Sequence, residues 1–350
     1  MRTYRLAALI CLSILATTAM AENAPDGKTV LDALGTKDSD IKKLESGKVV
    51  NFDGAPFENS SRELATDATV LINAPVPEVL EKLEATDSIV PSRKIIASGR
   101  LTGEGDFSGI SFEDNDKDNA EVQKLIKAKP GSDFNLSKEE WEWLQEHNKG
   151  AASLDAAGQR KLAAEAVQHI LKGRYLAYRE KGLEGIAPVL RNRKKSVDVS
   201  SDLRKTNATH QPIEEWFPDY YKVLTSYPEG ADCCEHEFRW LKVKIAKRRT
   251  FALTHTIVQE KDDYLLYTER FYYLDNSGNY GQVMLAWLPY EDNTYMGLAM
   301  SANTEVLDSL LGKILRSLGR NMAGELITDV LTDIKNDLES GETPDSLSDN

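Results

Sequence analysis

Cysteine is scarce in this chain, with three residues among 350. Cys11 lies inside an apolar segment near the N-terminus, which leaves the adjacent pair Cys233 and Cys234 for the rest of the chain. Two adjacent cysteines cannot provide the disulfide framework of small secreted domains, so stability must come from a hydrophobic core. The pair could form a ring, an intermolecular bridge or a reactive dithiol. No C-x-x-C motif supports a thioredoxin-like role.

The chain also has fewer basic than acidic residues: it contains 43 Lys and Arg and 56 Asp and Glu, which gives a formal net charge of −13. Such a chain lacks the basic footprint that phosphate binding needs, so nucleic acid is not an expected partner. One basic island consists of Arg191, Arg193, Lys194 and Lys195. It could contact anionic head groups at a membrane surface, or it could be a solvated turn.

Long hydrophobic runs are missing as well. The apolar run Leu6–Leu15 is too short to span a membrane. Arg2 and Arg5 precede it, and Ala19-Met20-Ala21 follows as a small-residue cleavage site. This arrangement is typical of a removable signal peptide over residues 1–21, so we expect an exported, periplasmic protein.

Motifs for catalysis and metal binding are absent from the sequence. It contains neither H-E-x-x-H nor G-x-S-x-G, and no P-loop. The acidic run 113–118 resembles the start of a calcium loop, but Asn119 and Leu125 stand where that loop requires Gly and Glu. His236 lies close to Cys233 and Cys234, yet neighbours on an extended strand point to opposite faces. We therefore expect no metal and no cofactor.

What the sequence does contain is a succession of five strand-like runs from about Cys234 to Met300. Phe251, Leu253, His255 and Ile257 alternate with smaller residues, which is the period of a strand. The run 264–274 is aromatic on both parities, and 294–300 alternates bulky with small residues. The links between these runs are short and polar, which favours antiparallel hairpins.

A long helix is predicted directly after these runs, over 304–338. Apolar residues recur at every fourth position from Val306 to Leu338, and this spacing predicts a helix with a broad apolar stripe. A sheet that is apolar on both faces needs such a cover. The predicted fold class is therefore α+β, with an antiparallel sheet gripping a long C-terminal helix.

The upstream half is predicted to supply a strand and a helix, followed by a mainly helical insertion. A strand is expected from Leu64, a helix after Pro75 and a strand over Lys94–Leu101, while residues 22–38 are small and polar and are expected to be irregular. Residues 103–205 are the predicted insertion, in which Ser137-x-x-Glu140 forms a capping box. The insertion could be a lid over a cavity or a helical layer on the sheet.

Residues 44–101 resemble the START-like helix-grip superfamily, which includes lipid-transfer proteins and polyketide cyclases. The matching pieces are Leu44-x-x-Gly47-x-Val49, the run VLINAPVPEVLEKLEATDSI over 70–89, and IIASGRL over 95–101. The resemblance implies a sheet gripping a helix with an apolar cavity between them. The expected divisions of the chain are a signal peptide over 1–21, the first part of the helix-grip-like domain over 22–102, the insertion over 103–205, the sheet and C-terminal helix over 206–338, and a disordered tail over 339–350.

The leading functional hypothesis is a binding protein for an apolar or amphipathic ligand, such as a lipid, held between the sheet and the C-terminal helix. Aromatic residues of the predicted strands are the candidates for its lining: Tyr264, Tyr267, Phe271, Tyr273 and Trp287.

Two alternatives belong to other classes. The first is a cavity enzyme of the cyclase or dehydratase type, in which His255 and Glu269 form an acid–base pair. The same residues could instead be a core histidine beside a structural pair of Glu269 and Arg270. The second alternative is a cell-envelope interaction module that docks through an apolar patch on residues 137–180.

Overall fold

The computed structural model describes residues 24–52, 60–84, 95–129, 131, 133–192, 195–245, 247–308 and 312–340. The signal peptide expected over residues 1–21 lies outside these residues, as does all but the first two residues of the tail expected over 339–350.

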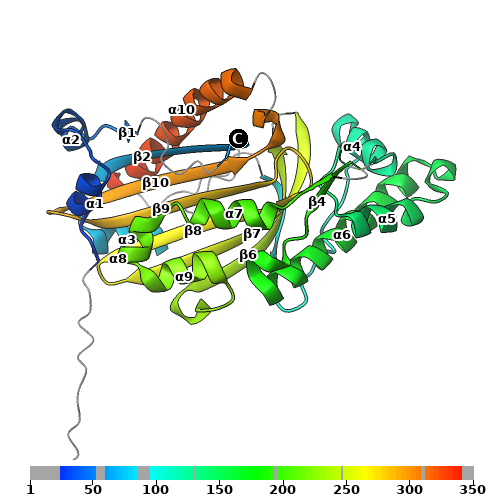
Figure 1. The fold of residues 1–350 in the computed structure, drawn as a ribbon, viewed down its shortest axis with the longest axis horizontal. Coiled ribbons are helices and arrows are strands. Elements are labelled where there is room, and N and C mark those ends of the chain that lie inside the picture. Colours follow the sequence, from blue (N-terminus) through cyan, green and yellow to red (C-terminus); the bar gives the residue numbers. More distant parts are fainter. Residues whose placement is uncertain are drawn as a thin grey trace, which may run out of the picture.

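The described residues form an eight-stranded antiparallel sheet in the order β1-β2-β10-β9-β8-β7-β6-β3 (Figure 1). Its strands are β1 (Val50–Asn51), β2 (Glu63–Ile72), β3 (Ile95–Leu101), β6 (Glu235–Ile245), β7 (Arg248–Lys261), β8 (Tyr264–Leu274), β9 (Tyr280–Tyr290) and β10 (Asn293–Asn303). The prediction of five consecutive antiparallel strands is confirmed by β6 to β10. β2 and β3, which come before them in the chain, pair with β10 and β6 at opposite ends of this meander.

Helices cover the sheet, and a two-stranded ribbon lies between two of them. The helices are α1 (Gly27–Ala33), α2 (Asp38–Glu45), α3 (Val76–Glu84), α4 (Asp116–Ile126), α5 (Lys138–His147), α6 (Ala156–Lys181), α7 (Val199–Asn207), α8 (Gln211–Trp216), α9 (Pro218–Ser226) and α10 (Gly312–Glu339). The 3-10 turns are η1 (Ala151–Ser153), η2 (Gly182–Gly185), η3 (Ala231–Cys233) and η4 (Glu305–Asp308), and the ribbon is β4 (Val189–Asn192) with β5 (Lys195–Val197).

One face of the sheet is covered by α3 and α10. Ile327, Leu331 and Ile334 of α10 pack with Trp287 and Met296 in one buried apolar cluster. The C-terminal helix expected over 304–338 is therefore present, although the 3-10 turn η4 precedes it and α10 begins at Gly312.

The opposite face is covered by α1 and by helices of the segment between β3 and β6 (Figure 1). The α5 capping box is confirmed, because Ser137 Oγ accepts from the Glu140 N–H and the Glu140 carboxylate accepts from the Ser137 N–H. The helical segment extends beyond the expected boundary at residue 205, as α8 and α9 continue it to Ser226. Because helices cover both faces of the sheet, the strands have apolar residues at both odd and even positions.

The helix α1 was not predicted, since residues 22–38 were expected to be irregular. Asp26 caps its N-terminus by accepting from the Thr29 N–H at 2.8 Å, and Leu31 is fully buried. A side chain at Gly27 would collide with Tyr295, so glycine allows the helix to lie directly on β10. A helix of seven residues depends on such tertiary packing, because isolated short helices are marginal in water.

Candidate functional site

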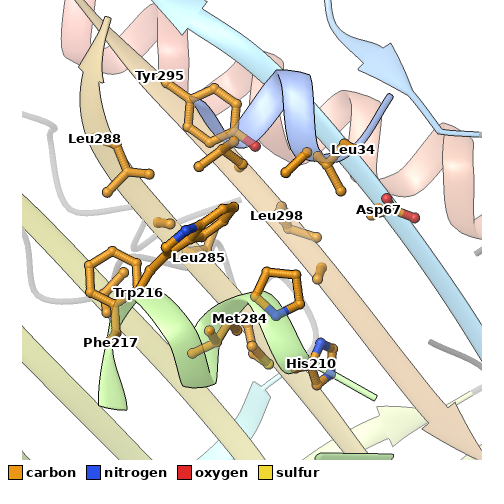
Figure 2. Close-up of a pocket in the computed structure, with 18 of the residues that line it drawn as sticks. Leu34, Asp67, His210, Trp216, Phe217, Met284, Leu285, Leu288, Tyr295 and Leu298 are labelled. Atoms are coloured by element: carbon orange, nitrogen blue, oxygen red, sulfur yellow. The ribbon is translucent and has the colours of Figure 1, made fainter. Parts of the chain in front are cut away.

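An apolar cavity of about 140 Å³ lies between α1, α8 and the face of the sheet opposite α10. Figure 2 shows Leu34 and Asp67 at one end of it and Phe217 at the other, with Met284 and Trp216 between them. An engineered apolar cavity of about 150 Å³ in another protein binds benzene, so the space suits a molecule of roughly six carbons.

The floor of the cavity is hollow because small residues meet on neighbouring strands. Gly297 of β10 is the register partner of Ala286 of β9, and Ala299 lies two residues further along β10. These residues are half-exposed in the middle of a sheet, whereas Leu288 and Tyr295 beside them are buried. The small side chains of Ala286 and Ala299 create the depression, and the ring of Tyr295 lies over Gly297 at its edge.

The walls and mouth come from two short helices. Val30 of α1 and Leu34, which caps its C-terminus, line the cavity together with Ile213 and Trp216 of α8, and all four are half-exposed. The proline near the start of α8 favours helix initiation there. The mouth therefore lies between α1 and α8, where half-exposed apolar side chains border the floor.

One carboxyl and one imidazole are among the side chains that line this mainly apolar space. Asp67 of β2 is 6% exposed, and among the described residues its Oδ1 has no hydrogen-bond partner. Burial raises the pKa of Asp67 to about 6. Burial also lowers the pKa of His210 to about 4, so that imidazole is neutral at pH 7. The wall thus contains one carboxyl that is ionised at neutral pH and, among the described residues that line it, no lysine or arginine.

The five aromatic residues predicted to line a ligand site do not share one face. Tyr264 and Tyr273 belong to the cluster on the side of the helical segment. Tyr267 and Trp287 belong to the cluster under α10, and Phe271 packs on a third cluster. The prediction requires correction because alternate residues of β8 point to opposite faces. Of the five, Tyr267 borders the cavity.

The space beneath the C-terminal half of α10 is occupied by side chains, whereas a hollow lined mainly by polar residues, among them Arg320, Glu325 and Asp329, lies beside its N-terminal half. Trp287, Met296 and Leu331 are fully buried in the filled part. The apolar cavity therefore lies on the opposite side of the sheet from the position expected for a ligand.

The predicted acid–base pair of His255 and Glu269 is also corrected. The register places His255 opposite Arg270 and Glu269 opposite Thr256, so the imidazole and the carboxylate lie on opposite faces of the sheet. Alternation in the sequence shows which residues of one strand share a face. Only the register between two strands decides which residues of the neighbouring strand lie on that same face.

His255 belongs instead to a buried hydrogen-bonded chain whose protons can be assigned. Arg270 Nη1 donates to Tyr178 Oη at 3.1 Å, and the Tyr178 hydroxyl donates to His255 Nδ1 at 3.0 Å. His255 Nε2 then donates to His236 Nδ1 at 2.8 Å, and His236 Nε2 donates to the Ala231 carbonyl at 2.9 Å. Arginine is only a donor, so the direction is fixed at one end and both imidazoles are neutral. Burial lowers the pKa of both histidines in accord with this assignment.

This chain of hydrogen bonds holds α6 to the sheet, and none of its five members lines the cavity. Replacing Tyr178 by phenylalanine is expected to lower the free energy of unfolding by about 2–3 kcal/mol, because it leaves a buried N–H of Arg270 and a buried nitrogen of His255 unpaired. Urea unfolding measures the change. Tyr221→Phe is the matched control, since Tyr221 is half-exposed; equal losses in the two variants would contradict the assignment.

The cysteine pair and the basic island were the remaining candidates from the sequence. Cys233 and Cys234 are joined by a disulfide, which is the ring among the three alternatives. Arg191 is half-buried, and its guanidinium forms an ion pair with Glu305 at 2.9 Å. Lys195 is exposed, while Arg193 and Lys194 lie outside the described residues.

The described part of the chain contains no group of three His, Cys, Asp or Glu residues arranged to hold a metal ion. No described helix has the length and apolar character needed to cross a membrane. On residues 137–180, the exposed large apolar residues are Leu154 and Leu176.

Fold and cavity together define an α+β protein with an antiparallel sheet covered on both faces and a small apolar pocket on one of them. No family model, curated protein or solved structure matches this chain.

Sequence reasoning missed the residues that form the pocket. A signal was present, because 294–300 alternates bulky and small residues, and Gly297 and Ala299 are the small ones that matter. Their meaning depends on Ala286 lying opposite Gly297, and on α1 and α8 lying above them.

Proposed function

We propose that this protein binds a small apolar or amphipathic molecule in the cavity between α1, α8 and the sheet. The observation that carries the proposal is the depression at Ala286 and Ala299, which leaves part of the centre of a sheet uncovered beneath a half-exposed apolar mouth. Pre-formed apolar cavities with a few polar groups are the usual form of small-molecule sites.

The resemblance of residues 44–101 to helix-grip proteins supports an apolar ligand class. In that superfamily the resemblance would imply a ligand under the terminal helix. We propose the opposite face of the sheet because side chains occupy the space under the C-terminal half of α10, and the hollow beside its N-terminal half has a mainly polar lining that does not suit an apolar ligand.

The expected affinity for a six-carbon probe is modest. Burying a CH₂ group contributes about 0.8 kcal/mol, so six carbons contribute about 5 kcal/mol before the cost of ordering the ligand. This corresponds to dissociation constants near the millimolar range. A natural ligand with a longer apolar part would extend through the mouth and bind more tightly.

Filling the cavity is expected to abolish binding. In Ala286→Leu the added side chain occupies the floor, so the affinity for hexanol should fall at least about tenfold, by the ~2 kcal/mol of the carbons it displaces. Isothermal titration calorimetry and ligand-observed NMR measure it. Ala302→Leu is the matched control, because Ala302 is a half-exposed alanine of β10 that does not line the cavity.

Two results would contradict the proposal. One is a wild-type protein that binds no hexanol, and the other is an Ala286→Leu variant that binds it as well as Ala302→Leu does.

We also propose that the protein is exported to the periplasm, on the basis of the n-region, apolar run and cleavage site within residues 1–21. Mass spectrometry of the protein from its own host tests this. A mature chain that begins at Glu22 is expected, and a chain that retains residues 1–21 would contradict it.

A further inference from the structure

We propose that the ligand of this cavity carries a protonated amine, which binds the carboxylate of Asp67. The inference rests on the proposed ligand-binding function and adds the chemistry of the head group.

The position of Asp67 directs its carboxyl toward the cavity. Asp67 lies in the middle of β2, and its register partner on β10 is Ala299, one of the three small residues of the floor. Since Ala299 is small, no large neighbour separates the carboxyl from the cavity. Figure 2 shows the two oxygens of Asp67 at the end of the cavity near Leu34.

One oxygen of the Asp67 carboxyl has no partner among the described residues. Asp67 is 6% exposed, and Oδ1 accepts no hydrogen bond from any described residue. Buried carboxylates in proteins are normally paired with a cation or with several donors. A partner supplied by the ligand would complete this site.

The other titratable groups that line the cavity carry no charge at pH 7. Burial lowers the pKa of His210 to about 4, and burial raises the pKa of Tyr220, Tyr267 and Tyr295 above the ordinary value. With no described lysine or arginine in the lining, a carboxylate or phosphate on the ligand would meet only the negative charge of Asp67. The site therefore selects against fatty acids and phospholipid phosphates and in favour of a cation.

The free energy that it costs to bury the charged form of Asp67 supports a functional role for this residue. Burial disfavours the charged form of Asp67, and nothing described in the fold offsets this. Groups that are uncompensated in this way, located at a cavity, are characteristic of binding and catalytic sites. A protonated amine at hydrogen-bonding distance would form a charge-assisted hydrogen bond, which is stronger than a neutral one.

The experiment compares three probes with the same six-carbon chain on the full-length mature protein at pH 8: hexylamine, hexanol and hexanoate. Hexylamine is expected to bind at least about tenfold more tightly than hexanol, and hexanoate more weakly than hexanol. In Asp67→Asn the advantage of the amine over hexanol should disappear. Asp67→Ser provides the same comparison if the asparagine variant folds poorly.

The control variant is Asp32→Asn, which removes an exposed carboxylate of α1 that does not line the cavity. It should keep the preference for hexylamine, which separates a specific contact from the effect of net charge.

Each other outcome has a distinct meaning. Equal binding of hexylamine and hexanol overturns the amine inference and leaves the proposed function standing. A preference for hexylamine that persists in both Asp67 variants also overturns the inference, because the amine then binds elsewhere. Absence of binding for all three probes overturns the proposed function itself.

Discussion

Replacing Trp287 by alanine should lower the free energy of unfolding by about 3–5 kcal/mol while hexanol binding is retained. Trp287 is fully buried in the cluster under α10, so its removal leaves a large void between the sheet and that helix. Its indole points away from the cavity, and it does not line it. Urea unfolding and calorimetric titration of the folded variant at low temperature measure the two effects.

The matched variant is Trp216→Ala at the mouth of the cavity. Trp216 is half-exposed, so the cost in stability should be smaller, about 1–2 kcal/mol, while hexanol affinity falls because one wall is lost. The pair separates the two faces of the sheet. If Trp287→Ala abolished binding and Trp216→Ala did not, the ligand would lie under α10 instead.

Asp67→Asn should stabilise the ligand-free protein, and the gain should depend on pH. Burial raises the pKa of Asp67 from 3.8 to about 6, so the folded protein holds this proton more tightly than the unfolded chain does. The stability that the protonated form contributes is present below about pH 4 and is lost as pH rises through about 6. The Asp67→Asn variant does not lose this stability as pH rises, because its amide does not ionise.

The difference in free energy of unfolding between Asp67→Asn and the wild type should therefore grow by about 2–3 kcal/mol between pH 4 and pH 8, because one pKa unit corresponds to about 1.4 kcal/mol. Urea unfolding at both pH values measures it. Asp32→Asn, at an exposed site, should show a difference within about 0.5 kcal/mol at both. A pH-independent difference for Asp67→Asn would mean that the carboxyl is not destabilised by burial.

A stabilising effect of Asp67→Asn would also bear on function. A residue that costs the free protein stability but contributes to ligand binding shows the trade-off between stability and activity that is common in functional sites. Saturating hexylamine should then raise the stability of the wild type more than that of Asp67→Asn, because a ligand stabilises the state that it binds.

Much of the fold could be predicted from local patterns. Period-2 alternation gave β7 and β10, continuous aromatic or apolar runs gave β8 and β9, the four-residue spacing after residue 304 gave α10, and the Ser137 and Glu140 spacing gave the start of α5. These signals are local, since each depends on residues a few positions apart. The helix α1 was missed because Val30, Leu31 and Leu34 form too short a stripe to be recognised without the Tyr295 surface on which it packs.

The site could not be predicted to the same degree, because it depends on pairing between distant segments. His255 and Glu269 looked like partners from their positions in neighbouring strands, yet the register separates them across the sheet. Conversely, Asp67 had no distinguishing signal in the run ELATDATVLI, where it is one polar residue in a strand.

The sequence by itself determined the α+β class, the antiparallel meander and the helix that covers it, because alternation and helical periodicity follow directly from backbone geometry. The tertiary structure alone decided which face of the sheet is filled and which is hollow. Trp287 and Ala286 are neighbours in the chain but lie on opposite faces, so one completes a packed core and the other forms the floor of a cavity. That outcome depends on Gly297 lying opposite Ala286 and on α1 and α8 lying above them, and these contacts join residues from Val30 to Ala299.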